Sequence, residues 1–163
     1  MNCEEYSREE ILNRLLLAFP VTPVLKKKQI IPWMTLPYDD ERYALAESLQ
    51  LRRWTEVPSW YLKQEWAALH LMSRRGYVYF LPAYLRVIVT EKMESDMIPS
   101  VVISTLCPAT ALGRKRIGML SLEQCKVLLL VVNYINDIMP DENCFGEVDC
   151  IIEFLHNKVC CKE

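Results

Sequence analysis

The chain has 163 residues, and its 19 Lys and Arg against 21 Asp and Glu give a formal net charge of −2. This length fits one domain with a sizeable core. A pI near 5.8 argues against nucleic acid as the main partner. The four glycines, at positions 76, 113, 118 and 146, form neither G-x-G-x-x-G nor a P-loop, which disfavours nucleotide-dependent enzymes of those classes.

The cysteines and the N-terminus bear on the compartment. The seven cysteines are odd in number and irregularly spaced, which predicts free thiols in a reducing environment. The acidic start, MNCEEYSREE, lacks the basic flank and apolar core of a secretory signal. No apolar run approaches the roughly 18 residues that a membrane span needs. We therefore expect a cytoplasmic protein with no membrane partner.

The first element is a capped helix that leads into a long loop. Ser7 and Glu10 have the S-x-x-E spacing of a capping box, and apolar residues follow at helical spacing up to Pro20. Residues 21–38 are rich in proline and contain the triplet Lys26–Lys28, so a loop with room for a short extended piece is predicted. Structureless loops of this length are often functional, which makes this one a candidate contact surface.

An aromatic stretch, residues 54–92, contains three of the four Trp and four of the eight Tyr, and we expect it to form the core. Helices are predicted over residues 41–53 and 60–72 from their apolar stripes. Residues 77–81 have strand-like composition, but Pro82 suits a first helical turn, so a helix from Pro82 to about Lys92 is favoured.

The C-terminal half continues the helical pattern. Residues 99–106 are compatible with a strand or a buried helix, and the neighbouring helices favour a helix. Residues 107–120, with the basic cluster Arg114–Arg116, are predicted as an exposed loop. A nearly all-apolar helix over 121–139 should cross the middle of the domain. We therefore predict an all-α, single compact domain over 1–163, with about six helices and an appended helix within 141–163.

Residues 127–157 contain six carboxylates and no Lys or Arg. Such a segment attracts a basic protein partner, although a merely solvated face has the same composition. We take its carboxylates as the candidate partner-binding residues: Asp137, Asp141, Glu142, Glu147, Asp149 and Glu153.

Four soft donors near the C-terminus raise the question of zinc: Cys150, His156, Cys160 and Cys161. Their spacing differs from the paired C-x-x-C arrangement of structural zinc sites. We therefore predict no metal, and no other pattern indicates a cofactor.

Other catalytic groupings are weak. His70 lies among apolar neighbours on a predicted helix, where a core histidine is commoner than a catalytic one. A nucleophilic pair of His70 with Cys107 or Cys125 stays open, although buried inert thiols are the commoner case. Glu56 and Glu65 resemble ordinary helix-surface glutamates. The sequence thus predicts no catalytic residue.

Several motifs carry a family resemblance: R-R-W-T-E-V (52–57), A-L-x-L-M-S (68–73), Y-x-Y-F-L-P-A-Y-L (77–85), I-x-x-L-x-P (103–108) and S-x-E-Q (121–124). Over about residues 8–138 the chain resembles a family of small, uncharacterised bacterial proteins that share a domain of unknown function. The resemblance implies a structural role for the Y-F-L-P-A-Y-L segment, transfers no catalytic residue, and finds no counterpart for the tail after Asp141.

Small relatives of this kind with acidic tails resemble the neutralising proteins found beside secreted bacterial toxins. The resulting hypothesis is a cytoplasmic immunity protein that is not an enzyme and blocks one toxin domain by direct binding; self-association is left open. The alternative is a small enzyme or ligand-binding domain whose pocket lies between the aromatic core and residues 21–38.

Overall fold

The computed structural model describes residues 7–32, 40–143 and 146–160. Within these ranges all of the regular secondary structure is helical and the chain forms one compact domain, as predicted, but it has ten α-helices rather than about six. No strand occurs in the same ranges. The elements are α1 (Arg8–Ala18), α2 (Lys27–Ile30), α3 (Asp40–Leu49), η1 (Trp54–Glu56), α4 (Ser59–Gln64), α5 (Ala68–Leu71), α6 (Arg74–Glu91), η2 (Lys92–Ser95), α7 (Ile98–Leu106), α8 (Ala111–Gly118), α9 (Leu122–Ile138), η3 (Pro140–Asn143) and α10 (Glu147–Cys160).

The central element is α6, which is buried on most sides. It begins at Arg74 because the Ser73 side chain caps it, accepting a hydrogen bond from the Gly76 N–H at 3.0 Å. Pro82, the predicted start, lies inside the helix, so the predicted boundary is wrong. Neither α6 nor any other helix in the described ranges has the length and apolarity to cross a membrane.

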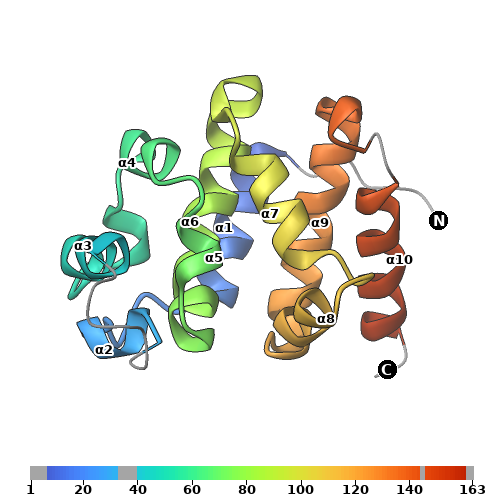
Figure 1. The fold of residues 1–163 in the computed structure, drawn as a ribbon. Coiled ribbons are helices and arrows are strands. Elements are labelled where there is room, and N and C mark those ends of the chain that lie inside the picture. Colours follow the sequence, from blue (N-terminus) through green and yellow to red (C-terminus); the bar gives the residue numbers. More distant parts are fainter. Residues whose placement is uncertain (1–6, 33–39, 144–145, 161–163) are drawn as a thin grey trace.

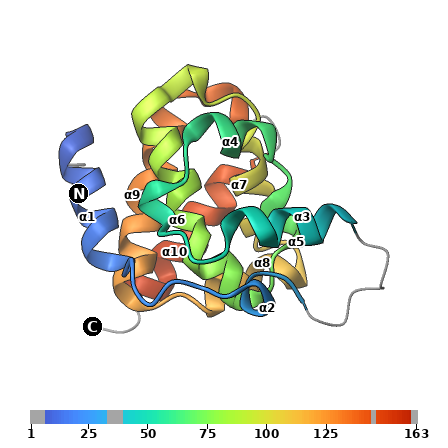
Figure 2. The ribbon, with the colours of Figure 1, turned by 90° about the vertical axis from the view of Figure 1, so that its left-hand side faces the viewer.

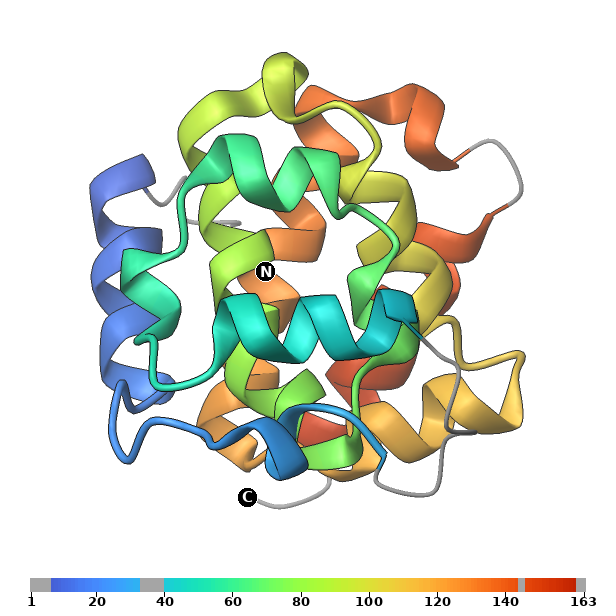
Figure 3. The ribbon, with the colours of Figure 1, turned by 60° about the vertical axis from the view of Figure 1, so that its left-hand side comes forward.

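The other helices surround α6 in layers. In Figure 1, α2, α3 and α4 lie on one side of α6, whereas α9 and α10 lie on the other. Figure 3 shows α3 and α4 crossing in front of α6, and Figure 2 shows α1 running beside α9 before the chain turns along the lower edge toward α2. Val148, Ile151 and Leu155 of α10 are buried, so the helix predicted as an appendage packs into the core.

The predicted helix over 60–72 is broken. It forms α4 and α5, because Glu65 leaves helical geometry with φ −99° and ψ 41°. Trp60, in the first turn of α4, and Trp66, just after the break, both lie on the surface, with exposed fractions of 64 % and 41 %. Trp54 alone of these three is buried, at 1 % exposed. The aromatic stretch therefore supplies both the core and part of the surface.

Two predictions for residues 99–120 have different outcomes. Residues 98–106 form the helix α7, so the choice of a helix over a strand for residues 99–106 is confirmed. Residues 111–118 form α8 rather than a loop, because the Thr110 hydroxyl caps the helix by accepting from the Gly113 N–H at 2.9 Å. Arg116 is 5 % exposed, so the basic cluster is not wholly on the surface.

Candidate functional site

The segment that follows α1, residues 18–25, is fixed by hydrogen bonds to several other parts of the chain. Four of its carbonyl oxygens accept hydrogen bonds from residues far away in sequence. The pairs are Gln124 Nε2 to Ala18 (3.3 Å), Trp54 Nε1 to Phe19 (3.2 Å), Tyr79 Oη to Val21 (2.7 Å) and the Leu51 N–H to Leu25 (2.8 Å). Because α9, η1 and α6 all contribute donors, this anchored segment has a fixed path over the helices.

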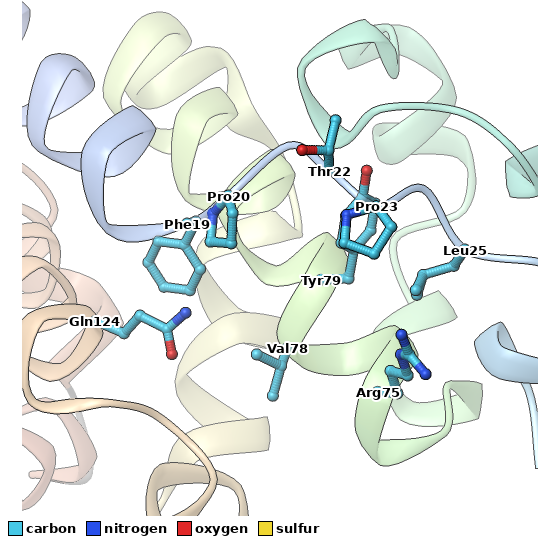
Figure 4. A pocket seen from close by; sticks show the side chains of 9 residues that line it. All are labelled: Phe19, Pro20, Thr22, Pro23, Leu25, Arg75, Val78, Tyr79 and Gln124. Atoms are coloured by element: carbon cyan, nitrogen blue, oxygen red, sulfur yellow. The ribbon is translucent and has the colours of Figure 1, made fainter.

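A concavity, here called the loop pocket, lies between the anchored segment and α6 (Figure 4). Its volume is about 180 Å³. Most of its wall is apolar, and a guanidinium, an amide and two hydroxyls supply the polar groups. The lining residues are Phe19, Pro20, Thr22, Pro23, Leu25, Arg75, Val78, Tyr79 and Gln124.

A second concavity, the Trp60 pocket, has a volume of about 200 Å³ and is lined by Ser48, Leu49, Arg52, Val57, Pro58, Trp60 and Tyr61. The Trp60 and Tyr61 rings meet edge to face, with centroids 5.9 Å apart. Burial raises the pKa of Tyr61, whose hydroxyl is hydrogen-bonded to Ser48. In the described part of the chain, the Trp60 indole N–H and the Arg52 guanidinium form no hydrogen bond or ion pair.

The structure gathers most of the predicted partner-binding carboxylates at one end of the molecule. This acidic end comprises the last turn of α9, η3 and the first turn of α10, with η2 nearby (Figure 1). Asp137, Asp141 and Asp149 are exposed. Glu142 is half-buried and accepts a hydrogen bond from the Ser100 hydroxyl at 2.6 Å, so it also has a structural role.

The other two carboxylates lie on α10. Glu147 is half-buried in the first turn, where a negative charge complements the helix dipole. Glu153 is exposed and follows Asp149 by four residues, which places both on one face of the helix.

The soft donors at the C-terminus form only a partial cluster. Cys160 Sγ lies 3.6 Å from His156 Nδ1, and Cys150 and Cys160 are both exposed thiols. Within the described ranges, no three His, Cys, Asp or Glu side chains converge on a metal position. Cys161 lies outside these ranges.

His70 is exposed, so the prediction of a core histidine is wrong. It lies on α5, just after the break that also exposes Trp66. Partial desolvation, and then repulsion by the Arg116 guanidinium, lower the pKa of His70 below its usual value. Cys107 and Cys125 are buried free thiols.

The two glutamates considered as an acid/base pair serve local structure. Glu56 is exposed, and its carboxylate accepts a hydrogen bond from the Arg53 N–H at 3.1 Å, which caps η1. Glu65 ends α4, and its backbone carbonyl accepts from the Tyr84 hydroxyl at 3.1 Å.

No local pattern along the chain predicted the burial of Arg116. Its guanidinium stacks over the Tyr77 ring at 4.5 Å and donates to the carbonyls of Thr105 (3.2 Å) and Leu69 (3.3 Å). The Tyr77 hydroxyl is 2.9 Å from the Thr105 hydroxyl. Burial raises the pKa of Tyr77 to about 12, so the ring stays neutral beneath the cation. This cluster ties α8 to α5, α6 and α7, and its role is structural.

Comparison with known proteins gives a family and no function. A model of a family of unknown function, DUF6714, matches residues 34–159. No curated protein and no solved structure shows significant similarity to the chain. The match continues through α10, whereas the sequence motifs suggested that it would stop near residue 138. It includes the whole Trp60 pocket, but the part of the loop pocket formed by residues 19–25 lies before it.

Proposed function

We propose that the chain, which belongs to the DUF6714 family of unknown function, is a protein-binding module whose contact surface is the Trp60 pocket. The observation that carries the proposal is the 64 % exposure of Trp60. An exposed tryptophan costs solvation free energy that burial against a partner recovers. Trp, Tyr and Arg are the residue types that dominate binding energy in protein interfaces, and Trp60, Tyr61 and Arg52 meet in this pocket.

The unpaired groups of the pocket add specificity to this apolar contact. The Trp60 indole N–H suits a backbone carbonyl of the partner, and the Arg52 guanidinium suits a carboxylate. Burying either group without a partner costs free energy, so a matching surface is selected over a merely apolar one. The pocket thus favours a partner segment that presents an apolar side chain beside an acidic one.

The most specific form of the proposal is toxin neutralisation. In this form the partner is a bacterial toxin domain, and binding occludes its active site in the cytoplasm. The acidic end supports this form because it would draw a basic partner and accelerate its association. The analogy of size and composition to immunity proteins supplies the remaining support.

The test is affinity capture from lysate of the source cells with three proteins: wild type, Trp60→Ala, and a control, Gln64→Ala, changed at an exposed position of the same helix. We expect a protein that wild type and the control retain and that Trp60→Ala loses. Because interface hot spots contribute 2 kcal/mol or more, the affinity should fall by about 30-fold or more. Equal retention by all three proteins would exclude this surface.

The acidic end is tested with the same partner. Reversing the charges of Asp141, Glu142, Glu147 and Asp149 should slow association at low salt more than it speeds dissociation. Raising the salt concentration should remove the difference, because the Debye length falls to about 3 Å at 1 M. Unchanged association at low salt would exclude a steering role for this end.

The alternative of a small enzyme or ligand-binding domain has one observation in its favour. The loop pocket lies between residues 19–25 and α6, and so beside the first residues of the loop where the alternative placed a site. The residues found to line it include no histidine, cysteine or carboxylate, so it lacks the groups for acid/base or nucleophilic chemistry. It therefore supports binding and not catalysis.

A further inference from the structure

The shape of the loop pocket is maintained by hydrogen bonds to backbone carbonyl oxygens of the anchored segment. Tyr79 holds the Val21 carbonyl and the Leu51 N–H holds the Leu25 carbonyl, one on each side of Thr22 and Pro23. These bonds oppose movement of the segment onto the exposed flank of α6. A concavity whose walls are fixed in advance binds a ligand without the cost of ordering a loop.

Two polar groups on the wall, the Gln124 amide and the Tyr79 hydroxyl, are already engaged within the protein. Gln124 Nε2 donates to the Ala18 carbonyl and Gln124 Oε1 accepts from the Ser121 N–H at 3.0 Å. The Tyr79 hydroxyl donates to Val21. Apart from Thr22 and Arg75, the rest of the wall is built from Phe19, two prolines, Leu25 and Val78, so the interior favours an apolar ligand body.

Arg75 is the one charged residue among those found to line the pocket. Figure 4 shows its side chain on the same side of α6 as Val78 and Leu25. Within the described ranges, its guanidinium forms no hydrogen bond or ion pair. A guanidinium beside an apolar cavity is the group that recognises a carboxylate through two parallel hydrogen bonds.

Helix stability does not account for this arginine. Arg75 lies in the first turn of α6, which contains no acidic residue, and a cation there opposes the helix dipole. The dipole also adds to the positive potential at the pocket rim. Several basic segments reach the same end of the molecule: α2, the start of α6, and α8 (Figure 1). An anion at Arg75 would relieve this unfavourable charge distribution.

The volume limits the size of the ligand. An engineered apolar cavity of about 150 Å³ accommodates benzene, and the loop pocket, at about 180 Å³, is slightly larger. We propose that the loop pocket is a binding site for a small carboxylic acid with an apolar body of about six to nine carbon atoms. The body occupies the space beside Phe19, Pro23 and Val78, and the carboxylate pairs with Arg75. The site is separate from the Trp60 pocket and from protein binding there.

The test is an NMR titration of the ¹⁵N-labelled chain with 3-phenylpropanoate and, separately, with its neutral amide. We expect saturable shift changes confined to the backbone amides of residues 75–79, 121–124 and, apart from Pro20 and Pro23, 19–25. Because the guanidinium–carboxylate contact is charge-assisted, the amide should bind about tenfold more weakly than the acid. Acetate has the charge without the body and should bind about as weakly as the amide.

Two variants form a matched pair. Arg75→Gln and Arg74→Gln each remove one positive charge from the first turn of α6, and both side chains are exposed, so neither change threatens the fold. Arg75→Gln should weaken binding of the acid about tenfold. Arg74 does not line the pocket, so Arg74→Gln should change the affinity for the acid by less than about threefold. Trp60→Ala should leave it unchanged, which separates this site from the protein-binding surface.

Several results would overturn the assignment. Shift changes that are absent or scattered over the molecule would show that the pocket is not a site. Equal weakening by Arg74→Gln and Arg75→Gln, or equal binding of acid and amide, would show that Arg75 does not recognise the carboxylate. A peptide that ends in phenylalanine with a free carboxylate, binding more than tenfold tighter than the acid, would make the occupant a protein chain end instead.

Discussion

Tyr79 and Val21 are 58 residues apart in sequence, yet the Tyr79 hydroxyl donates to the Val21 carbonyl at 2.7 Å. The same oxygen lies 3.5 Å from the Arg52 carbonyl, at the limit of a hydrogen bond. One phenol on α6 thus lies where the anchored segment meets the residues that follow α3. Partial burial raises the pKa of Tyr79 above its ordinary value, so the hydroxyl also stays protonated and able to donate in mildly alkaline solution.

Removing this hydroxyl should loosen the anchored segment. Tyr79→Phe keeps the ring and leaves the Val21 carbonyl without its donor, so the free energy of unfolding should fall by about 0.5–1.5 kcal/mol. Urea denaturation gives this value, and hydrogen exchange should accelerate at residues 19–25. Tyr43→Phe is the control, because its hydroxyl has no hydrogen-bond partner in the described ranges. Similar losses in the two variants would show that Tyr79 does not secure the segment.

The tryptophans should differ sharply in their effect on stability. Trp54 is 1 % exposed and donates to the Phe19 carbonyl, so Trp54→Ala should cost about 3–5 kcal/mol. Trp60→Ala removes a side chain that is 64 % exposed and should cost less than about 1 kcal/mol. The cost of Trp66→Ala should lie between these two values, because Trp66 is 41 % exposed. Denaturant midpoints measure all three, and equal costs for Trp54 and Trp60 would contradict the placement of Trp60 on the surface.

Elements specified by local chemistry were predictable from the sequence. Ser7 and Ser121 both cap their helices as predicted, because a capping side chain needs only the backbone three residues further on. The return hydrogen bond of the predicted capping box forms at Gln124, whereas the Glu10 carboxylate pairs with Arg14 instead. The break after α4 was not predictable in this way. The Tyr84 hydroxyl, from α6, binds the Glu65 carbonyl at the point where the helix was expected to continue. Propensity within residues 60–72 contains no information about that phenol.

The candidate sites likewise differ in whether local sequence was enough to predict them. The composition of residues 127–157 was enough to predict an acidic surface, because charge needs no particular contact to be present. The loop pocket depends on hydrogen bonds from Gln124 and Trp54, which are 106 and 35 residues away from their acceptors. The Trp60 pocket is lined by residues of α3, of α4 and of the segment between them, which the fold brings together. Contacts between residues so far apart in sequence cannot be predicted from residue spacing, so both pockets could be identified only in the folded structure.

The glycines of α8 should respond to alanine in opposite directions. A Cβ at Gly113 would collide with the backbone carbonyl of Cys107, so Gly113→Ala should destabilise the protein by about 2–3 kcal/mol. At Gly118 nothing lies within 4 Å of a new Cβ. Gly118→Ala should therefore stabilise the helix by up to about 1 kcal/mol. Thermal melts in which both variants shift in the same direction would contradict the close approach of α8 to Cys107.

Arg116 should not be replaceable by lysine. Lysine keeps the charge, but it lacks the planar group that stacks on Tyr77 and reaches the carbonyls of both Thr105 and Leu69. Arg116→Lys should therefore lower the free energy of unfolding by about 2 kcal/mol. Lys115→Ala changes an exposed neighbour in the same helix and should stay within about 0.5 kcal/mol of wild type. Equal stability of Arg116→Lys and wild type would show that charge alone is required.

Stability should fall in alkaline solution because of Tyr77. Burial raises the pKa of Tyr77 in the folded protein to about 12, against 10.0 for the free side chain. Below pH 10 the phenol is neutral in both states, and its contribution to stability is complete. Between about pH 10 and pH 12 the unfolded chain loses this proton while the folded chain keeps it, so stability falls, by about 2–3 kcal/mol in all.

Burial also raises the pKa of Tyr84, which acts in the same direction. Urea denaturation of wild type and Tyr77→Phe from pH 8.5 to pH 11.5 measures the Tyr77 share. The variant loses the contact with Thr105 and starts from a lower stability, but its stability should fall less steeply above pH 10. The exposed Tyr43→Phe control should follow wild type. Parallel curves for wild type and Tyr77→Phe would show that the Tyr77 phenol is not buried as a neutral group.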